Sequence, residues 1–124
     1  DINKSIHYFS LAAKQNHPNA QFLLGFYYYM GINTPKNIKK GQYYIIQSSL
    51  NGLIQGNFSH GFLLHEGRYI ERNIKEAIHY YKEASSFNNQ YAKNNLGIIY
   101  KNGFGDEIEE NIGYAIEYFE EAIR

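Results

Sequence analysis

The chain has 124 residues, of which 44% are hydrophobic and 17% aromatic, so it can bury a modest core and does not have the composition of a disordered protein. Its formal net charge is zero, which argues against nucleic acid as the main partner. Because the chain has no cysteine, it has no disulfide framework, no thiol nucleophile and no cysteine metal site.

The charges are nevertheless unevenly distributed along the chain. Residues 1–100 carry ten Lys or Arg against five Asp or Glu, whereas residues 101–124 carry two against seven. A solvated acidic helix end is the simpler interpretation of the second segment, and an acidic docking edge is the alternative. The longest apolar run, from Phe22 to Ile32, is too short to span a bilayer, so we expect no membrane insertion.

Helical spacing of apolar residues, together with capping residues, predicts seven helices and no strands. The first helix spans residues 2–16 with an N-cap at Asp1, and the second begins at Pro18, runs to Met30 and stops at Gly31. Five more helices are expected, at residues 38–51, 55–66, 74–87, 91–102 and 112–123. Further N-caps are expected at Asn37, Asn73 and Asn111, and Asn73 with Glu76 resembles a capping box.

The same short pattern opens every second helix. It is Asp or Asn followed by Ile, and its four starts, at Asp1, Asn37, Asn73 and Asn111, are 36, 36 and 38 residues apart. When the repeats are aligned on these starts, three further positions, which we call columns, keep the same type of residue. They are a small residue (Ser5, Gly41, Ala77, Ala115), a tyrosine (Tyr8, Tyr44, Tyr80, Tyr118) and a second small residue (Ala12, Ser48, Ala84, Ala122). Seven helices in antiparallel pairs at a near-constant period predict an all-α solenoid.

Glycines recur in the helices between these starts, at Gly25, Gly61 and Gly97. Glycine in a helix interior costs about 1 kcal/mol relative to alanine, so a repeated glycine indicates a repeated purpose. We expect the paired helix to approach closely there, with the first small-residue column facing the glycines. We also expect the tyrosine column to fill space between neighbouring units.

The residues from Ala92 to Ala122 resemble the Sel-1-like repeat, a relative of the tetratricopeptide repeat. The shared pattern is Ala92-x-x-x-Leu96-Gly97-x-x-Tyr100-x-x-Gly103-x-Gly105, followed by Asn111-x-x-x-Ala115-x-x-Tyr118-x-x-x-Ala122. The same columns hold Ala20, Leu24, Gly25, Tyr28 and Gly31, and the middle unit departs from them with Gly56, His60 and Leu64. The resemblance covers essentially the whole chain and implies a right-handed α-α superhelix.

The resemblance also divides the chain into units. By its pattern, a closing helix at residues 1–16 precedes three units at 17–51, 53–87 and 90–124, and in each unit an opening helix comes before a closing helix. Because the sequence begins without Met and stops inside a repeat, we expect it to be cut from a longer protein.

No arrangement of residues in the sequence indicates catalysis, a metal or a cofactor. His60 and His65 are five residues apart and do not converge on a helix, and His7 and His79 lie two units apart. The turn Gly103-Phe104-Gly105 lacks the Gly-Lys-Ser/Thr of a phosphate-binding loop, and no Gly-x-Ser-x-Gly or His-Glu-x-x-His motif is present. We therefore predict a protein that is not an enzyme, with no catalytic, cofactor-binding or metal-binding residues.

The resemblance implies that a partner binds in a concave groove lined by the opening helices. The candidate contacts, taken from exposed inner positions of those helices, are Phe22, Phe26, Tyr29, Phe58, Phe62, His65, Tyr91, Ile98 and Lys101. The aromatic residues among them would form an apolar surface of the kind that marks binding sites. For Phe22 and Phe58, packing within the fold is the alternative, because that column is often aromatic in the family.

The function implied by the resemblance is a non-enzymatic scaffold or adaptor that holds a protein or peptide partner. Sel-1-like proteins include adaptors for membrane ubiquitin ligases in endoplasmic-reticulum-associated degradation, so that role and a secretory compartment such as the ER lumen are implied by analogy. The alternative is a rigid structural spacer without its own ligand. Exposed repeat ends also predict end-to-end self-association.

Overall fold

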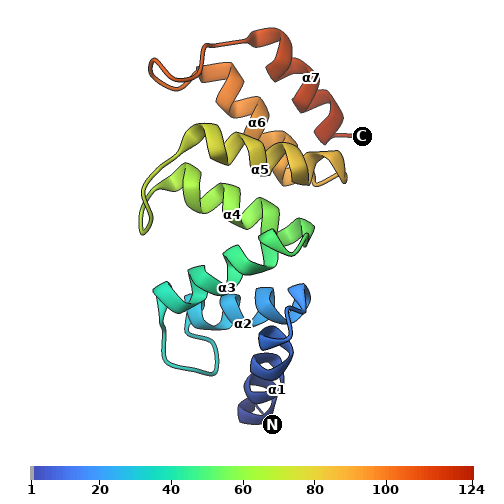
Figure 1. Ribbon diagram of the computed structural model, residues 1–124. Helices are drawn as coiled ribbons and strands as arrows, with labels where there is room; N and C mark the ends of the chain where they lie inside the picture. The colour runs from blue at the N-terminus through green and yellow to red at the C-terminus, as the bar shows by residue number, and fades with distance from the viewer. Residues whose placement is uncertain (1) are drawn as a thin grey trace. The chain divides into compact units, whose positions relative to one another are not determined.

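The computed structural model describes residues 2–124, which form helices joined by turns and loops (Figure 1). In chain order these are α1 (Ile2–Lys14), α2 (Pro18–Met30), α3 (Ile38–Leu50), α4 (Ile54–Glu66), α5 (Ile74–Ser86), α6 (Gln90–Asn102) and α7 (Ile112–Ala122). The predicted seven helices are confirmed, and each end lies within two residues of its expected position. Within residues 2–124, the only strand-like pairing is an isolated bridge between Phe104 and Ile108 in the loop before α7.

Asparagine side chains cap the starts of closing helices, as predicted. Hydrogen bonds from the backbone N–H groups of Lys40, Glu76 and Tyr114 reach the Oδ1 atoms of Asn37, Asn73 and Asn111 at 3.1, 3.1 and 3.0 Å. Asn73 Nδ2 also donates to Glu76 Oε2 at 3.1 Å, a side-chain form of the predicted capping box. A cap that we did not predict, Asn89, accepts from the N–H of Ala92 at 2.8 Å at the start of α6. The predicted cap at Asp1 lies outside the described residues.

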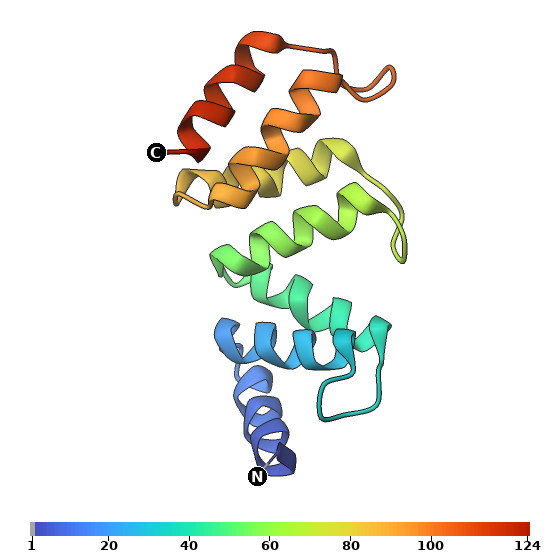
Figure 2. The ribbon, with the colours of Figure 1, turned by 180° about the vertical axis from the view of Figure 1, so that it is seen from behind.

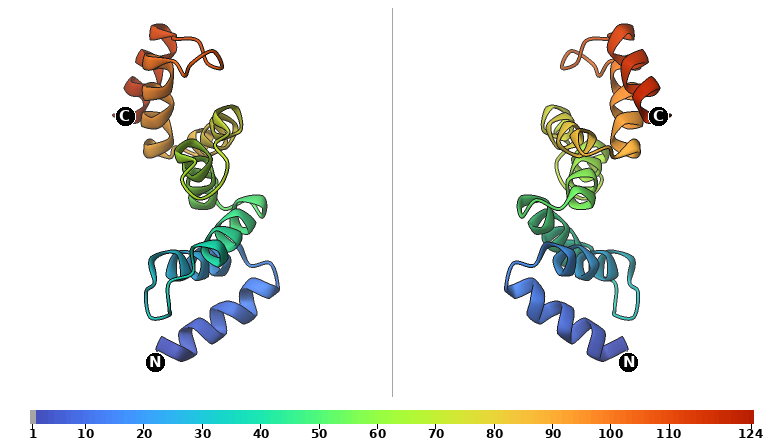
Figure 3. Two further views of the ribbon diagram at one scale, coloured as in Figure 1. Left: turned by 90° about the vertical axis from the view of Figure 1, so that its left-hand side faces the viewer. Right: turned by 90° about the vertical axis from the view of Figure 1, so that its right-hand side faces the viewer.

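The helices form two compact units, Asp1–His60 and Gly61–Arg124. The first contains α1, α2, α3 and the beginning of α4, and the second contains the end of α4 with α5, α6 and α7 (Figures 1 and 2). In the first unit α2 packs against α1 and α3, and in the second α6 packs against α5 and α7. The side views show α2 beside α3 and α6 beside α7 (Figure 3). Of these contacts, α2 with α3 and α6 with α7 join an opening helix to the closing helix that follows it in the repeat.

The core of the first unit forms where α1 meets α2. Ala13, Ala20 and Leu24 are buried there, surrounded by the partly buried side chains of Ile6, Phe9, Ala12, Tyr28 and Tyr44. The close approach predicted at the glycines is confirmed between α2 and α3, where a Cβ on Gly25 would lie 2.8 Å from the backbone oxygen of Gly41. Gly61 similarly faces Tyr81 and Ala77 of α5. Glycine is therefore required where two helix backbones come together.

Two tyrosines of the repeated column stack on tyrosines of the opening helices. Tyr44 stacks on Tyr28 of α2, with ring centroids 6.4 Å apart and 17° between the planes. In the second unit Tyr118 stacks on Tyr100 of α6, at 6.0 Å and 7°. These two tyrosines join the opening and closing helices of one pair, and Tyr44 also packs against the core that includes Ala13 of α1.

Gln42 of α3 is a buried polar residue at a position that is isoleucine in the other closing helices, at Ile6, Ile78 and Ile116. Its Nε2 has no hydrogen-bond partner among the described residues. Because a buried, unpaired amide costs about 1–3 kcal/mol, we expect Gln42→Ile to raise the free energy of unfolding by about 1 kcal/mol. Urea denaturation followed by circular dichroism measures the change, and a variant less stable than the wild type would contradict it.

Candidate functional site

Three of the predicted partner contacts lie on α2. Phe22, Phe26 and Tyr29 are four and three residues apart, which places them on one side of the helix. The ring of Phe26 is 41% exposed, while Phe22 and Tyr29 are partly buried. Leu24 and Gly25, on the remaining sides of α2, are buried against α1 and α3. The first unit therefore gathers these three predicted residues into one apolar stripe.

The predicted contacts on α4 follow the same spacing. Phe58 is partly buried in the part of α4 that belongs to the first unit. In the second unit Phe62 is 44% exposed and His65 is partly buried, while the intervening Leu63 and Leu64 are buried. Phe62 and His65 are therefore on the more solvent-exposed side of this helix.

The remaining predicted contacts, Tyr91, Ile98 and Lys101, are all exposed on α6. They are seven and three residues apart and so lie along one side of the helix. Ala92 and Leu96 lie on the other side and have no exposed surface. The second unit thus presents a mixed apolar and basic stripe on α6.

His65 takes part in a hydrogen-bonded cluster that the sequence did not reveal. Its Nδ1 lies 3.0 Å from the hydroxyl of Tyr81, and Asn95 Nδ2 donates to the same hydroxyl at 3.4 Å. Burial is the main cause that lowers the pKa of His65, and nearby Arg72 adds to it, with Glu66 acting in the opposite direction. Burial also raises the pKa of Tyr81 to about 12. The cluster joins α4, α5 and α6, so His65 has a structural role in this unit.

This cluster predicts a pH dependence of stability. The folded state holds His65 neutral, with a pKa below the ordinary value of 6.5, so the unfolded chain binds the proton more readily. The stabilising contribution of His65 is therefore complete above about pH 6.5 and is lost as the pH falls below that value. We expect the free energy of unfolding to fall from pH 7 to pH 5.5, and to fall less in His65→Gln, when both proteins are measured by urea denaturation. Equal pH profiles would contradict this assignment.

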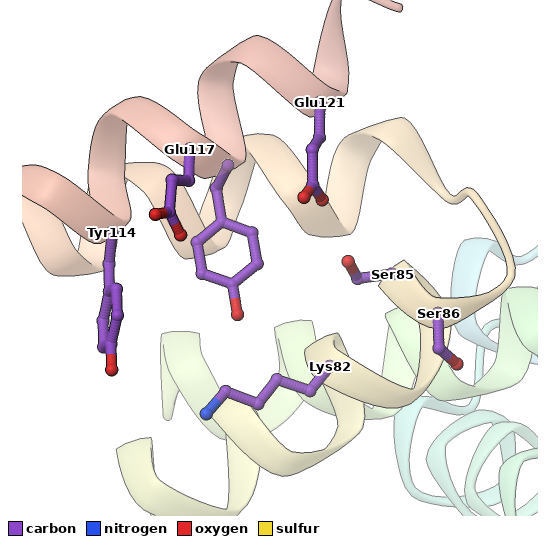
Figure 4. Close-up of a pocket in the computed structure, with 7 residues that line it drawn as sticks. Lys82, Ser85, Ser86, Tyr114, Glu117 and Glu121 are labelled. Atoms are coloured by element: carbon purple, nitrogen blue, oxygen red, sulfur yellow. The ribbon is translucent and has the colours of Figure 1, made fainter.

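A crevice of about 520 Å³ lies between α5 and α7 in the second unit (Figure 4). Its walls are Lys82, Ser85 and Ser86 of α5 and Tyr114, Glu117, Tyr118 and Glu121 of α7. The carboxylates of Glu117 and Glu121 point toward the space between the helices (Figure 4). We did not predict this crevice, and its two carboxylates belong to the acidic segment of residues 101–124.

The crevice combines charged, hydroxyl and aromatic groups. Burial raises the pKa of the Tyr118 hydroxyl, and the ammonium of Lys82 acts in the opposite direction. The ring of Tyr114 meets that of Tyr100 edge-on, with centroids 5.4 Å apart. Such a surface can hold polar side chains of a peptide.

Among residues 2–124, no group of three or more His, Asp or Glu is placed to hold a metal ion, and no helix is long and apolar enough to cross a membrane.

A comparison with protein families matches the chain in four segments. The matching family model is described as Sel1 repeat, and the matched residues are 1–17, 18–53, 54–86 and 90–124. These segments cover nearly the whole chain.

Solved structures with similar folds include three bacterial proteins. A Sel1 repeat protein from Oxalobacter formigenes is 24% identical, with a TM-score of 0.91, over 99% of this chain and 49% of that protein. A protective antigen of uropathogenic Escherichia coli strains that displays an SLR fold is 23% identical, with a TM-score of 0.90, over 99% of this chain and 26% of that protein. Cysteine-rich protein B of Helicobacter pylori is 25% identical, with a TM-score of 0.71, over 100% of this chain and 87% of that protein. The chain thus spans about half and about a quarter of the length of the first two.

Proposed function

Because the chain belongs to the Sel1 repeat family, we propose that it is a non-enzymatic scaffold that binds a partner protein or peptide through the exposed sides of its opening helices. Domains of this family are generally protein–protein interaction modules and are generally non-catalytic. The nine residues predicted from the sequence are the proposed contacts, three on each of α2, α4 and α6: Phe22, Phe26, Tyr29, Phe58, Phe62, His65, Tyr91, Ile98 and Lys101.

The observation that carries the proposal is the exposed aromatic ring of Phe26. It is 41% exposed at the centre of the α2 stripe, and Met30 at the end of the same helix is 54% exposed. Both side chains project from a helix whose other sides are held by α1 and α3, so their positions are set before a partner arrives. Aromatic side chains and methionine are enriched in interfaces because they bury a large area on contact. A partner with apolar side chains at helical or extended spacing fits this stripe.

The second unit adds charge to the proposed contacts. Ile98 supplies an apolar contact on α6, and Lys101 lies one turn farther along the same side. A carboxylate on the partner would meet Lys101, while an apolar side chain covers Ile98. Lys101 lies near the solvent, so it contributes more to orientation and association rate than to affinity.

By analogy with the best-known members of the family, we extend the proposal to an adaptor in endoplasmic-reticulum-associated degradation. In that role the partner would be a client protein or a subunit of a membrane ubiquitin ligase, and the location would be the ER lumen. Support for this finer role is family analogy alone. Its test is the identity of the captured partner and the compartment from which it comes.

We expect a Phe26→Glu/Phe62→Glu double variant to lose its partner in a pull-down from source lysate. Each substitution places a carboxylate where an apolar contact would be buried, so we expect affinity to fall at least tenfold for the partner that wild type retains. The matched control is Tyr43→Glu/Phe87→Glu, with one exposed aromatic residue changed in each unit. Polar residues stand at the equivalent positions of other repeats, such as Glu117 for Tyr43 and Asn51 for Phe87, so the fold accepts them. Thermal unfolding of all three proteins shows whether they are equally stable.

The outcomes separate this proposal from the alternative of a rigid spacer. A partner that is retained by wild type and the control but lost by the double variant supports the opening-helix surface. A partner that binds all three proteins equally places the binding surface elsewhere. If the folded wild type captures nothing, the chain is better described as a spacer without its own ligand.

A further inference from the structure

The crevice between α5 and α7 has two walls, each formed by one side of a helix. On α7 the lining positions follow the spacing i, i+3, i+4 and i+7, which places them on one side: Tyr114, Glu117, Tyr118 and Glu121. The wall on α5 follows the same spacing, at Lys82, Ser85 and Ser86. Its volume of about 520 Å³ lies within the range of about 300–1,000 Å³ that is usual for ligand pockets.

The first unit has a corresponding crevice between α1 and α3, which differs in charge and size. Its volume is about 240 Å³, and Tyr43 and Gln47 of α3 are among its lining residues. When the repeats are aligned, these two stand at the positions of Glu117 and Glu121. The described residues that line the first crevice include no carboxylate, and Lys14 adds a positive charge. Such a crevice thus occurs where further helices follow in the chain, and the two carboxylates distinguish that of the second unit.

The two carboxylates have no basic partner among the described residues. Glu117 and Glu121 are one turn apart and both point into the space between the helices (Figure 4), and like charges at this spacing repel each other. Lys82 extends toward Tyr114 (Figure 4), with its Nζ 6.0 Å from the centroid of the Tyr100 ring. Within residues 2–124 neither carboxylate forms an ion pair. A cation bound between Glu117 and Glu121 would therefore relieve their repulsion.

The surroundings of the two carboxylates favour a guanidinium as this cation. A guanidinium is planar and carries five N–H donors, so one group can bridge two carboxylates. Ser85 lies across from Glu121 (Figure 4) and supplies a further oxygen acceptor. The ring of Tyr114 is 50% exposed, and a guanidinium stacks well on an aromatic face. A metal ion fits less well, because no third His, Asp or Glu among residues 2–124 completes a site.

We propose that the crevice between α5 and α7 binds an arginine side chain of a partner protein, with the guanidinium between Glu117 and Glu121. Lys82 at the other end of the crevice repels a second cation, so a segment with one arginine among neutral residues fits better than a run of basic residues. None of the residues that line the crevice belongs to the proposed opening-helix contacts. Either proposal can therefore fail without the other.

The test is a titration of the ¹⁵N-labelled protein with the peptide acetyl-Gly-Ala-Arg-Ala-Gly-amide, which has no other charged group. Ion pairs near the surface contribute little to affinity, so backbone amide shifts are followed to millimolar peptide. We expect saturable shifts at residues 82–86 and 114–121. The same peptide with citrulline in place of arginine has nearly the same shape without the charge, and we expect it to bind about fivefold more weakly.

Two protein variants show whether the crevice or the overall charge is responsible. Glu117→Gln/Glu121→Gln is expected to bind the arginine peptide about fivefold more weakly than wild type. The matched control, Glu83→Gln/Glu120→Gln, removes the same charge from exposed positions of α5 and α7 outside the crevice and is expected to bind like wild type. Glutamine and glutamate have similar helix propensities, so we expect both variants to unfold at the wild-type temperature.

The remaining outcomes locate the binding and decide the proposal. Phe26→Glu/Phe62→Glu is expected to bind the arginine peptide like wild type, which separates this result from that of the opening-helix surface. Equal binding of the two peptides, absence of saturation, or an equal loss in the crevice variant and its control would overturn the proposal. Shifts of the same size around Tyr43 and Gln47 would show that any crevice between closing helices takes the peptide, and would also overturn it.

Discussion

Replacing Gly41 with alanine is expected to lower the free energy of unfolding by about 3 kcal/mol, which is a large part of the stability of a small domain. A Cβ at this position would lie 2.6 Å from the backbone nitrogen of Tyr29 and 2.7 Å from the backbone oxygen of Gly25. Both obstacles belong to the backbone of α2, so no side-chain rotation relieves them. The two helices would have to move apart, which loosens the α2–α3 packing along its length. Urea denaturation followed by circular dichroism measures the change.

The matched control is Gly113→Ala in α7. A Cβ there meets only Asn111 Oδ1, at 3.4 Å, which is an ordinary contact. Alanine has a higher helix propensity than glycine, so this variant is expected to be unchanged or more stable by up to about 1 kcal/mol. If Gly41→Ala were as stable as Gly113→Ala, the explanation of Gly25 and Gly41 by backbone contact between α2 and α3 would be wrong.

The helices and the glycine contacts could be predicted because local and periodic signals agree. Pro18 opens α2 and Gly31 ends it in a left-handed conformation, with φ of 71°, at the position where the sequence placed the stop. The asparagine caps follow the same logic, since their side chains satisfy backbone N–H groups within the same turn. The glycine contacts are longer in range, and only their repetition at a fixed spacing made them visible in a single sequence.

The crevice and the His65 cluster could not be predicted because they depend on the directions of side chains on different helices. The crevice forms between α5 and α7, with α6 intervening in the chain. His65 was identified from its place on α4, but its partner Tyr81 stands in a column occupied by Ile45 and Phe119 in other pairs. Because only one repeat has a hydroxyl at this position, the periodicity of the sequence does not indicate the hydrogen bond that it makes. The nine proposed partner contacts rest on the family resemblance, and the exposed ones among them are Phe26, Phe62, Tyr91, Ile98 and Lys101.

Truncation of Tyr81 to alanine is expected to lower the free energy of unfolding of the protein by about 4 kcal/mol. Its side chain has no exposed surface, and it is one of the largest fully buried side chains among the described residues. The ring packs under Gly61 of α4, where a Cβ would come within 2.8 Å of Tyr81 Cδ1, so its removal leaves a cavity between α4 and α5. The measurement is urea denaturation at pH 7, where His65 is neutral.

The variant Tyr81→Phe separates the ring from the hydroxyl. It keeps the packing under Gly61 but leaves His65 Nδ1 and Asn95 Nδ2 without the hydroxyl at 3.0 and 3.4 Å. We expect a loss of about 1–2 kcal/mol, since unpaired polar groups in a partly buried site cost about that much. A Tyr81→Ala variant within about 1 kcal/mol of wild type would show that the ring is not a main element of the core. If Tyr81→Phe matched wild type at every pH, the hydroxyl would have no part in holding α4, α5 and α6 together.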